Sequence, residues 1–210
     1  MAYDLQEQDQ IDALRAFWNR WGTVILAVVS AVLIAIAGWR GYGWWQQKQS
    51  VEASAIHERL RKAVDARDLA MVKQVSGELF EKYPRTIYAS MGALLTARAY
   101  FDGGDLKAAK PPLQWAIDKA SDPDHRLLAR LRLAGVLLDE KSHDEALKLL
   151  SVPDAGAHAG AFADRRGDIL VDQGKPAEAR SAYKEALDKL QPTSPLKPVV
   201  QIKLDALGGA

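Results

Sequence analysis

Near its N-terminus the chain carries one long run of apolar residues. The rest of the sequence, in which polar and apolar residues are interspersed over short distances, has no second run of this length. From Trp21 to Trp39 there are 19 residues without a charge, bounded by Arg20 and Arg40. A helix of this length rises about 28 Å, close to the hydrocarbon thickness of a bilayer. Tryptophan, which prefers membrane interfaces, lies at or beside both ends of the run, as Trp18, Trp21, Trp39, Trp44 and Trp45. We therefore predict a transmembrane helix over 21–39, after a short N-terminal segment over 1–20.

Two other interpretations of this run are a buried core helix and a cleaved signal peptide. A core helix is rarely apolar on every side over such a length. The sequence from Ala35 to Ala37 fits the small-x-small pattern that a signal peptidase cleaves. However, four acidic residues precede the run, whereas a signal peptide begins with a net positive segment. A retained anchor is therefore the preferred interpretation.

Small residues recur every four positions within the run, at Ala27, Ala31 and Ala35. A face of small residues lets a second helix approach closely, so we predict that these alanines pack against another membrane helix. The competing explanation is that alanine is simply common in membrane helices. Lys and Arg are few on both sides of the run. Their count leans slightly toward a cytoplasmic C-terminus but does not decide the orientation.

After a juxtamembrane aromatic segment over 40–50, the apolar residues follow helical periods, and strand-like alternation is absent. Short polar turns separate helices that we expect at 51–66, 69–83, 87–101, 106–120, 125–140, 144–150, 158–172, 177–190 and 196–207. The predicted fold class is therefore all-α. It consists of a single N-terminal transmembrane helix followed by a tetratricopeptide-like helical-repeat solenoid over 51–210.

The repeats are expected because consecutive helices pair into units of about 33 to 37 residues. In the clearest unit, over 163–192, Gly167 and Ala179 are expected to meet where the two helices cross, since only small residues allow a close approach. An earlier unit departs from the pattern, because Pro111 and Pro112 fall inside its second helix. There we expect a broken helix, or one that begins near Pro111. A nonrepetitive helical bundle is the alternative.

Composition and charge narrow the range of functions. The 28 Lys and Arg balance 27 Asp and Glu, so the chain lacks the basic excess needed to neutralise phosphates, and no nucleic-acid partner is expected. Cysteine is absent, which excludes disulfides, thiolate metal sites and thiol catalysis. The four histidines lack metal-ligand spacing, and phosphate-binding and nucleophile motifs are missing. No metal, cofactor or small-molecule substrate is expected.

A catalytic function has little support in the sequence. An enzyme would need an acid–base pair, and the one candidate is Asp164 with Asp168, one turn apart on a helix. No positioned histidine, nucleophile or metal ligand accompanies these two residues. We therefore expect a non-catalytic protein.

Helical repeats present a concave surface, built from the first helix of each pair, that commonly binds a peptide or a partner helix. A partner segment is predicted to dock on this face at Met91, Arg98, Phe101, Asp164 and Asp168. Leu94 and Gly135 are expected on the same face. Met and Phe adapt to varied apolar partners, while the charged residues orient the partner. The alternative is that Met91 and Phe101 pack against the neighbouring helix.

Several segments resemble the YfgM-like family, the ancillary subunit of the bacterial SecYEG translocon. They are DQIDALRAFW at 9–18, GWR at 38–40, LRLA at 131–134, ADRRGD at 163–168 and ARSAY at 179–183. The resemblance covers nearly the whole chain.

This resemblance implies a cytoplasmic segment over 1–20, a helix in the lipid bilayer of the inner membrane and a periplasmic repeat domain. It implies two partners, the SecYEG translocon and the membrane-anchored periplasmic chaperone PpiD, and a non-catalytic scaffold that assists the hand-over of translocated proteins. The alternative is a tetratricopeptide adaptor for another cell-envelope assembly complex.

Overall fold

The computed structural model describes the backbone of residues 2–208 and the side chains of residues 10–208. These residues form nine α-helices, one short 3-10 helix and no strand, which confirms the all-α class. The elements are α1 (Ala2–Asp65), α2 (Leu69–Lys82), α3 (Ile87–Asp102), α4 (Leu106–Lys119), α5 (Pro123–Asp139), α6 (His143–Leu150), η1 (Gly156–His158), α7 (Ala159–Asp172), α8 (Pro176–Lys189) and α9 (Leu196–Ala206).

The chain forms two compact units, Met1–Gln49 and Ser50–Ala210. Helix α1 contributes to both, so the helix expected at 51–66 is the last part of a much longer helix. Within the first unit, an 18-residue window of mean hydropathy 2.3 makes α1 long and apolar enough to cross a membrane. Its large side chains, such as Leu33 and Ile34, are exposed. This exposure argues against a core helix, whose apolar side chains would be covered by protein.

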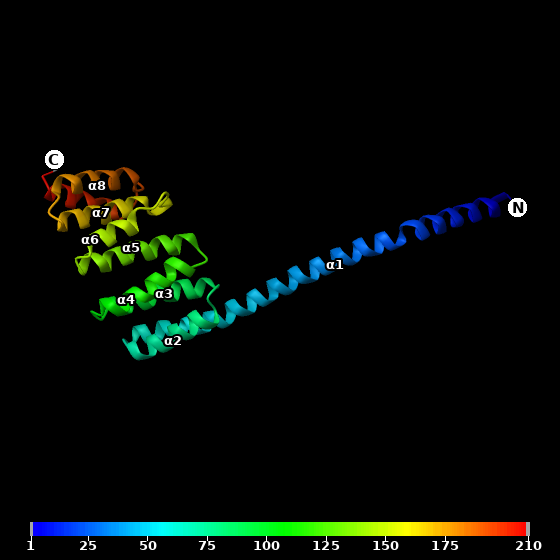
Figure 1. Cartoon of the computed structure of the whole chain (residues 1–210), viewed down its shortest axis with the longest axis horizontal. Coiled ribbons are helices and arrows are strands. Elements are labelled where there is room, and N and C mark those ends of the chain that lie inside the picture. The colour runs from blue at the N-terminus through cyan, green and yellow to red at the C-terminus, as the bar shows by residue number, and fades with distance from the viewer. Residues whose placement is uncertain (1, 209–210) are drawn as a thin grey trace. The chain divides into compact units, whose positions relative to one another are not determined.

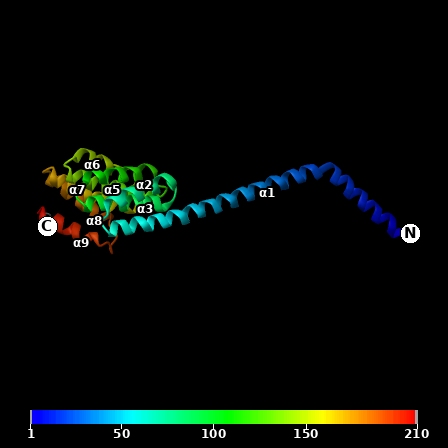
Figure 2. The same cartoon turned by 90° about the horizontal axis from the view of Figure 1, so that it is seen from below.

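In the second unit, helices α2 to α8 are stacked in the order of the chain (Figure 1), and Figure 2 shows the same helices from a second side. Helix α3 packs on α4, α5 on α6 and α7 on α8, and α9 packs on α8. The first helices of successive pairs also touch, α3 with α5 and α5 with α7. This arrangement is that of a helical-repeat solenoid, in which each pair contacts only its neighbours.

The turn inside each helix pair has the same backbone conformation. In these turns four residues adopt a left-handed φ between +56° and +79°, at intervals of 37, 37 and 33 residues: Arg67, Gly104, Lys141 and Gly174. After each of them, a backbone N–H donates to a carbonyl five residues earlier, as in Asp105 N to Tyr100 O at 2.9 Å. This bond pattern terminates a helix at a left-handed residue. The backbone therefore confirms the predicted repeat period of about 33 to 37 residues.

Close helix packing in the last pair depends on a glycine. A Cβ atom placed on Gly167 would lie within 3 Å of three ring atoms of Tyr183. Ala179 is completely buried in the same cluster. The side chain nearest to Gly167 is therefore that of Tyr183 on α8, rather than that of Ala179 as the repeat register predicts.

The expectation for Pro111 and Pro112 is wrong, because α4 is helical from Leu106 to Lys119 and contains both prolines. The prolines remove two backbone donors from the second turn. Two features offset this loss. Asp105 caps the helix by accepting a hydrogen bond from Ala108 N at 2.9 Å. In addition, the buried face of α4 continues through Pro112 itself, so that apolar burial holds the helix against its neighbours.

Candidate functional site

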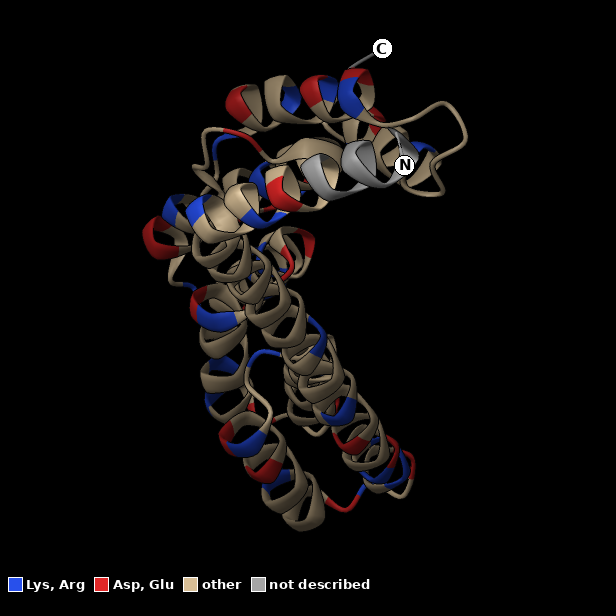
Figure 3. Cartoon of the chain, turned by 90° about the vertical axis from the view of Figure 1, so that its right-hand side faces the viewer, with Lys and Arg blue, Asp and Glu red and all other residues tan. Residues whose placement is uncertain are grey.

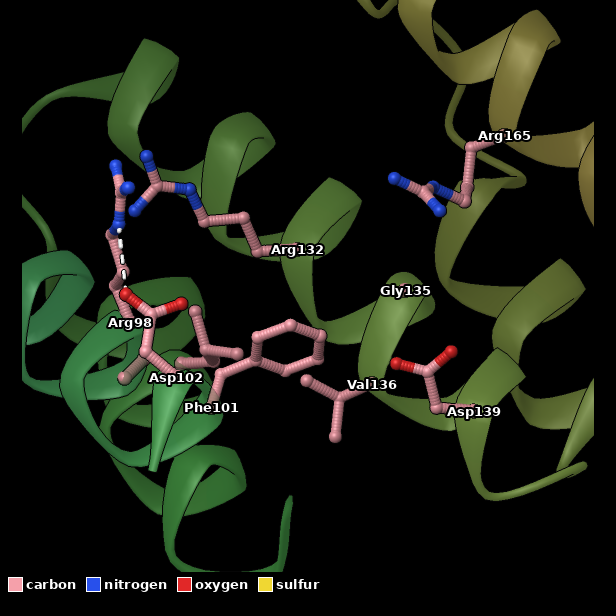
Figure 4. A pocket seen from close by; sticks show the side chains of 10 residues that line it. Arg98, Phe101, Asp102, Arg132, Gly135, Val136, Asp139 and Arg165 are labelled. Atoms are coloured by element: carbon pink, nitrogen blue, oxygen red, sulfur yellow. Dashed lines mark hydrogen bonds and ion pairs between the residues drawn. The ribbon is translucent and has the colours of Figure 1, made fainter. Parts of the chain in front are cut away.

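The first helices of three consecutive pairs enclose a cavity of about 310 Å³ in the repeat domain. Helix α3 supplies Phe101 and Arg98, α5 supplies Arg132 and Gly135, and α7 supplies Arg165. Figure 4 shows Arg132 and Arg165 at opposite ends of the cavity above the exposed ring of Phe101, with the guanidinium of Arg132 turned toward that of Arg98. Asp102, Val136 and Asp139 complete the labelled wall. The cavity thus combines an apolar floor with three guanidinium groups and two carboxylates.

The three arginines differ in how far the protein already uses them. Arg98 Nε lies 3.3 Å from Asp102 Oδ2, one turn along α3. Arg132 Nη1 donates to the backbone carbonyl of Leu94 at 3.1 Å, and Arg132 forms no ion pair with any described residue. Burial, and secondly the charge of Arg98, lower the pKa of Arg132 below its usual value. A guanidinium nevertheless stays protonated at neutral pH.

Arg165 reaches the cavity over a glycine. A Cβ atom on Gly135 would lie 3.5 Å from Arg165 Cζ, an ordinary van der Waals distance, so the guanidinium lies close over the backbone of α5. Arg165 Nη1 is 3.7 Å from Asp168 Oδ2, an ion pair too long for a hydrogen bond. Arg165 Nε is buried without a hydrogen-bond partner among the described residues. Arg165 therefore has donors that the protein does not satisfy.

The two predicted aspartates lie on α7 outside this cavity, where they join the last three helices. Lys203 Nζ on α9 donates to Asp164 at 2.8 Å and to Asp168 at 2.7 Å. Tyr183 OH on α8 also donates to Asp168, at 2.9 Å. A role of these aspartates in partner binding stays a prediction, and a partner would have to compete with Lys203.

Burial shifts the pKa of two groups in this cluster, Asp164 and Tyr183. Asp164 is only 8% exposed, and burial raises the pKa of its carboxyl above the usual value although the hydrogen bond from Lys203 opposes the shift. Burial, and then the charge of Asp168, raise the pKa of Tyr183 far above its usual range.

No group of three or more acidic or histidine side chains within residues 10–208 is placed to hold a metal ion.

The structure brings together some of the predicted face but not all of it. Arg98, Phe101 and Gly135 line the cavity. Met91 is exposed but lies outside it. The expectation for Leu94 is wrong, since Leu94 is buried in the core cluster that α3 shares with α4 and α5.

Arg132 and Arg165 are among the cavity residues that the predicted face did not include, although the sequence carries a signal for them. Arg98, Arg132 and Arg165 follow one another at intervals of 34 and 33 residues. This interval is the repeat period, so the three arginines occupy equivalent positions on α3, α5 and α7. Comparing the repeats position by position would have grouped them.

The predicted helix-packing face of the apolar run lies in the first unit. Ala27, Ala31 and Ala35 are all exposed there. Their packing against another membrane helix stays a prediction.

Paired helices, turns with a common left-handed residue and a groove on the first-helix face define a tetratricopeptide repeat-like protein. The chain matches the family described as "Tetratricopeptide repeat-like domain" over residues 15–209. It is 30% identical over 211 residues to the ancillary SecYEG translocon subunit of Neisseria gonorrhoeae, covering 99% of this chain and 100% of that protein. It is 29% identical over 202 residues to the Escherichia coli protein of the same name, covering 96% of each. The chain therefore belongs to the family of ancillary SecYEG translocon subunits, as the resemblance to the YfgM-like family predicts.

Proposed function

We propose that the protein is a membrane-anchored, non-catalytic scaffold that binds the SecYEG translocon and assists the hand-over of translocated proteins to a periplasmic chaperone. The observation that carries this proposal is the full-length similarity to relatives named as ancillary SecYEG translocon subunits. The cavity on the first-helix face supports it, because helical repeats use such surfaces to bind segments of other proteins. PpiD is the proposed chaperone.

The proposal places the parts of the chain as follows: a cytoplasmic N-terminus over 1–20, a span of the inner membrane over 21–39, a juxtamembrane aromatic segment over 40–50 and a periplasmic repeat domain over 51–210. The exposed apolar surface of α1 supports the span. Trp21 and Trp39 suit the interfaces at its two ends.

A non-catalytic role agrees with the side chains of the groove. Arginine stays protonated at neutral pH and cannot act as a general base there. The carboxylates of Asp164 and Asp168 are engaged by Lys203 and lie outside the cavity. Specific recognition of another chain is the chemistry that these residues support.

Co-purification of the full-length protein from membranes in a mild detergent tests the proposal. We expect SecYEG and PpiD among the partners identified by mass spectrometry. Phe101→Ala should weaken recovery of the partner bound in the groove, because it removes the exposed ring. Met71→Ala, which truncates a similarly exposed side chain on α2 outside the cavity, should not. Recovery of a different envelope complex in place of SecYEG would instead indicate an adaptor for that assembly.

A further inference from the structure

We infer that the cavity between α3, α5 and α7 recognises a partner segment that presents carboxylates beside an apolar side chain. This inference rests on the proposed function, because it names the chemistry of a protein segment that the scaffold would bind. It is carried by the unused donors of two arginines, by the exposed phenyl ring in the same cavity and by the repetition of the arginines along the groove.

The donors come from Arg132 and Arg165. Arg98 forms an ion pair with Asp102, whereas Arg132 uses one of its five N–H groups in a hydrogen bond to the carbonyl of Leu94. The ion-pair partner of Arg165 is Asp168, which already accepts hydrogen bonds from Tyr183 and Lys203. Both guanidiniums can therefore donate to an incoming carboxylate, and such charge-assisted hydrogen bonds are about twice as strong as neutral ones.

The apolar part of the site is the ring of Phe101, 42% of which is exposed, together with Val136. An aromatic ring provides a large contact area for an apolar side chain. A cavity of about 310 Å³ is at the lower end of the range for ligand pockets. It has room for a few side chains of one segment.

The distribution of charge favours a protein segment over a membrane surface. A lipid surface requires a broad basic face. Lys and Arg are instead interspersed with Asp and Glu over the helices (Figure 3). The arginines also recur once per repeat along α3, α5 and α7. A segment that runs along the groove would meet them in succession, so the site favours several spaced carboxylates.

Asp139 sets a limit on where those carboxylates can lie. It lines the same cavity, and no ion pair of Asp139 is seen among the described residues. A carboxylate placed directly over it would be repelled. The carboxylates of the segment are therefore best placed beside Arg132 and beside Arg165, away from Asp139, and this placement fixes the register of the segment.

Peptide binding to the full-length protein in a non-ionic detergent tests the inference. The probe is a fluorescent peptide of about twelve residues composed of glutamate, aspartate, leucine and phenylalanine. The control peptide has the same order with every carboxylate replaced by an amide. We expect the acidic peptide to bind at least about tenfold more tightly than its amide control.

Three variants locate the binding site. Arg132→Gln and Arg165→Gln should each weaken binding of the acidic peptide by about tenfold. Arg130→Gln is the matched control, because it removes the same charge from α5 but faces a different hollow, beside Lys107 and Lys148. It should leave the affinity unchanged. Since Arg132 also donates to Leu94, Arg165→Gln alone decides the matter if Arg132→Gln lowers the melting temperature.

Several results would overturn the inference. Equal affinity for the acidic and amide peptides would show that the cavity does not recognise carboxylates. An equal loss in Arg130→Gln would reveal a general attraction to positive charge. Displacement of the peptide by low concentrations of inorganic phosphate would indicate a site for small anions. Loss of anionic-vesicle binding in Arg165→Gln, with peptide binding intact, would assign the arginines to a membrane.

The same preparations separate this inference from the proposed function. If the wild-type protein binds the acidic peptide but does not co-purify with SecYEG, the proposed function fails and the cavity remains a site for acidic segments. If SecYEG is recovered and the acidic peptide does not bind, the inference fails and the scaffold proposal stands.

Discussion

At the scale of single residues, glycines in this protein have opposite physical roles. Gly167 lies where α7 meets the ring of Tyr183, so its missing Cβ is what permits the close approach of α7 and α8. Gly77, inside α2, has no atom within 4 Å of a Cβ position. In an open helical position glycine only adds conformational freedom to the unfolded chain.

Alanine substitutions should therefore change stability in opposite directions. Gly167→Ala forces Tyr183 to move, and we expect it to lower the free energy of unfolding by about 1 to 3 kcal/mol. Gly77→Ala, the matched control, should raise it by about 0.5 to 1 kcal/mol. Denaturant unfolding measures both. An unchanged stability in Gly167→Ala would mean that the ring of Tyr183 can shift without cost.

At the scale of elements, helix α4 is held by packing more than by its own hydrogen bonds. Pro111 and Pro112 interrupt its backbone ladder while its buried face remains continuous. Pro111 is exposed and contributes little burial, so its effect on the helix is mainly the loss of a donor. Pro176 is different, because it is the first residue of α8, where the N–H has no partner in a helix.

This contrast predicts different effects for the two prolines. Pro111→Ala restores a backbone N–H for the carbonyl of Lys107, and we expect it to raise the free energy of unfolding by about 1 to 3 kcal/mol. Pro176→Ala restores no intrahelical bond and should change stability little. Thermal and urea unfolding of the two variants would make the comparison. A similar change in both would show that the hydrogen bond lost at Pro111 has no net cost.

At the scale of the whole molecule, the apolar run of α1 and the repeat domain are suited to different surroundings, lipid and water. The repeat domain buries its apolar residues in three clusters. The apolar run of α1 leaves its own exposed, and a lipid bilayer is the environment in which such a surface is stable. This difference is what the proposed anchoring of the protein at one end requires.

We accordingly expect the full-length protein to remain in the membrane fraction after an alkaline carbonate wash, with its N-terminal residues intact. A double variant, Val28→Arg with Leu33→Arg, should be extracted, because each arginine near the centre of a span costs about 2.5 to 3.5 kcal/mol on an insertion scale. Sequencing of the mature N-terminus is the second measurement. A chain that begins at Gly38 would identify Ala35 to Ala37 as a cleavage site instead of part of an anchor.

Much of the fold follows from local sequence. The apolar run and the helical periods depend only on residues close together in the chain, so the expected helix ends agree closely with α2 to α9. The repeat period is also local, because each turn needs a residue that tolerates or is held in a left-handed conformation, such as Gly104 or Gly174.

Other features depend on contacts between residues far apart in the chain, and only the tertiary structure decides them. Packing keeps α4 helical through its prolines, and Leu94 is buried because α4 and α5 cover that side of α3. Lys203, on the last helix, donates hydrogen bonds to Asp164 and Asp168. The repeat register of α7 alone predicts that both aspartates are exposed. Bringing Arg132, Arg165 and Phe101 to one cavity likewise requires three repeats to be stacked, because these residues lie on α5, α7 and α3.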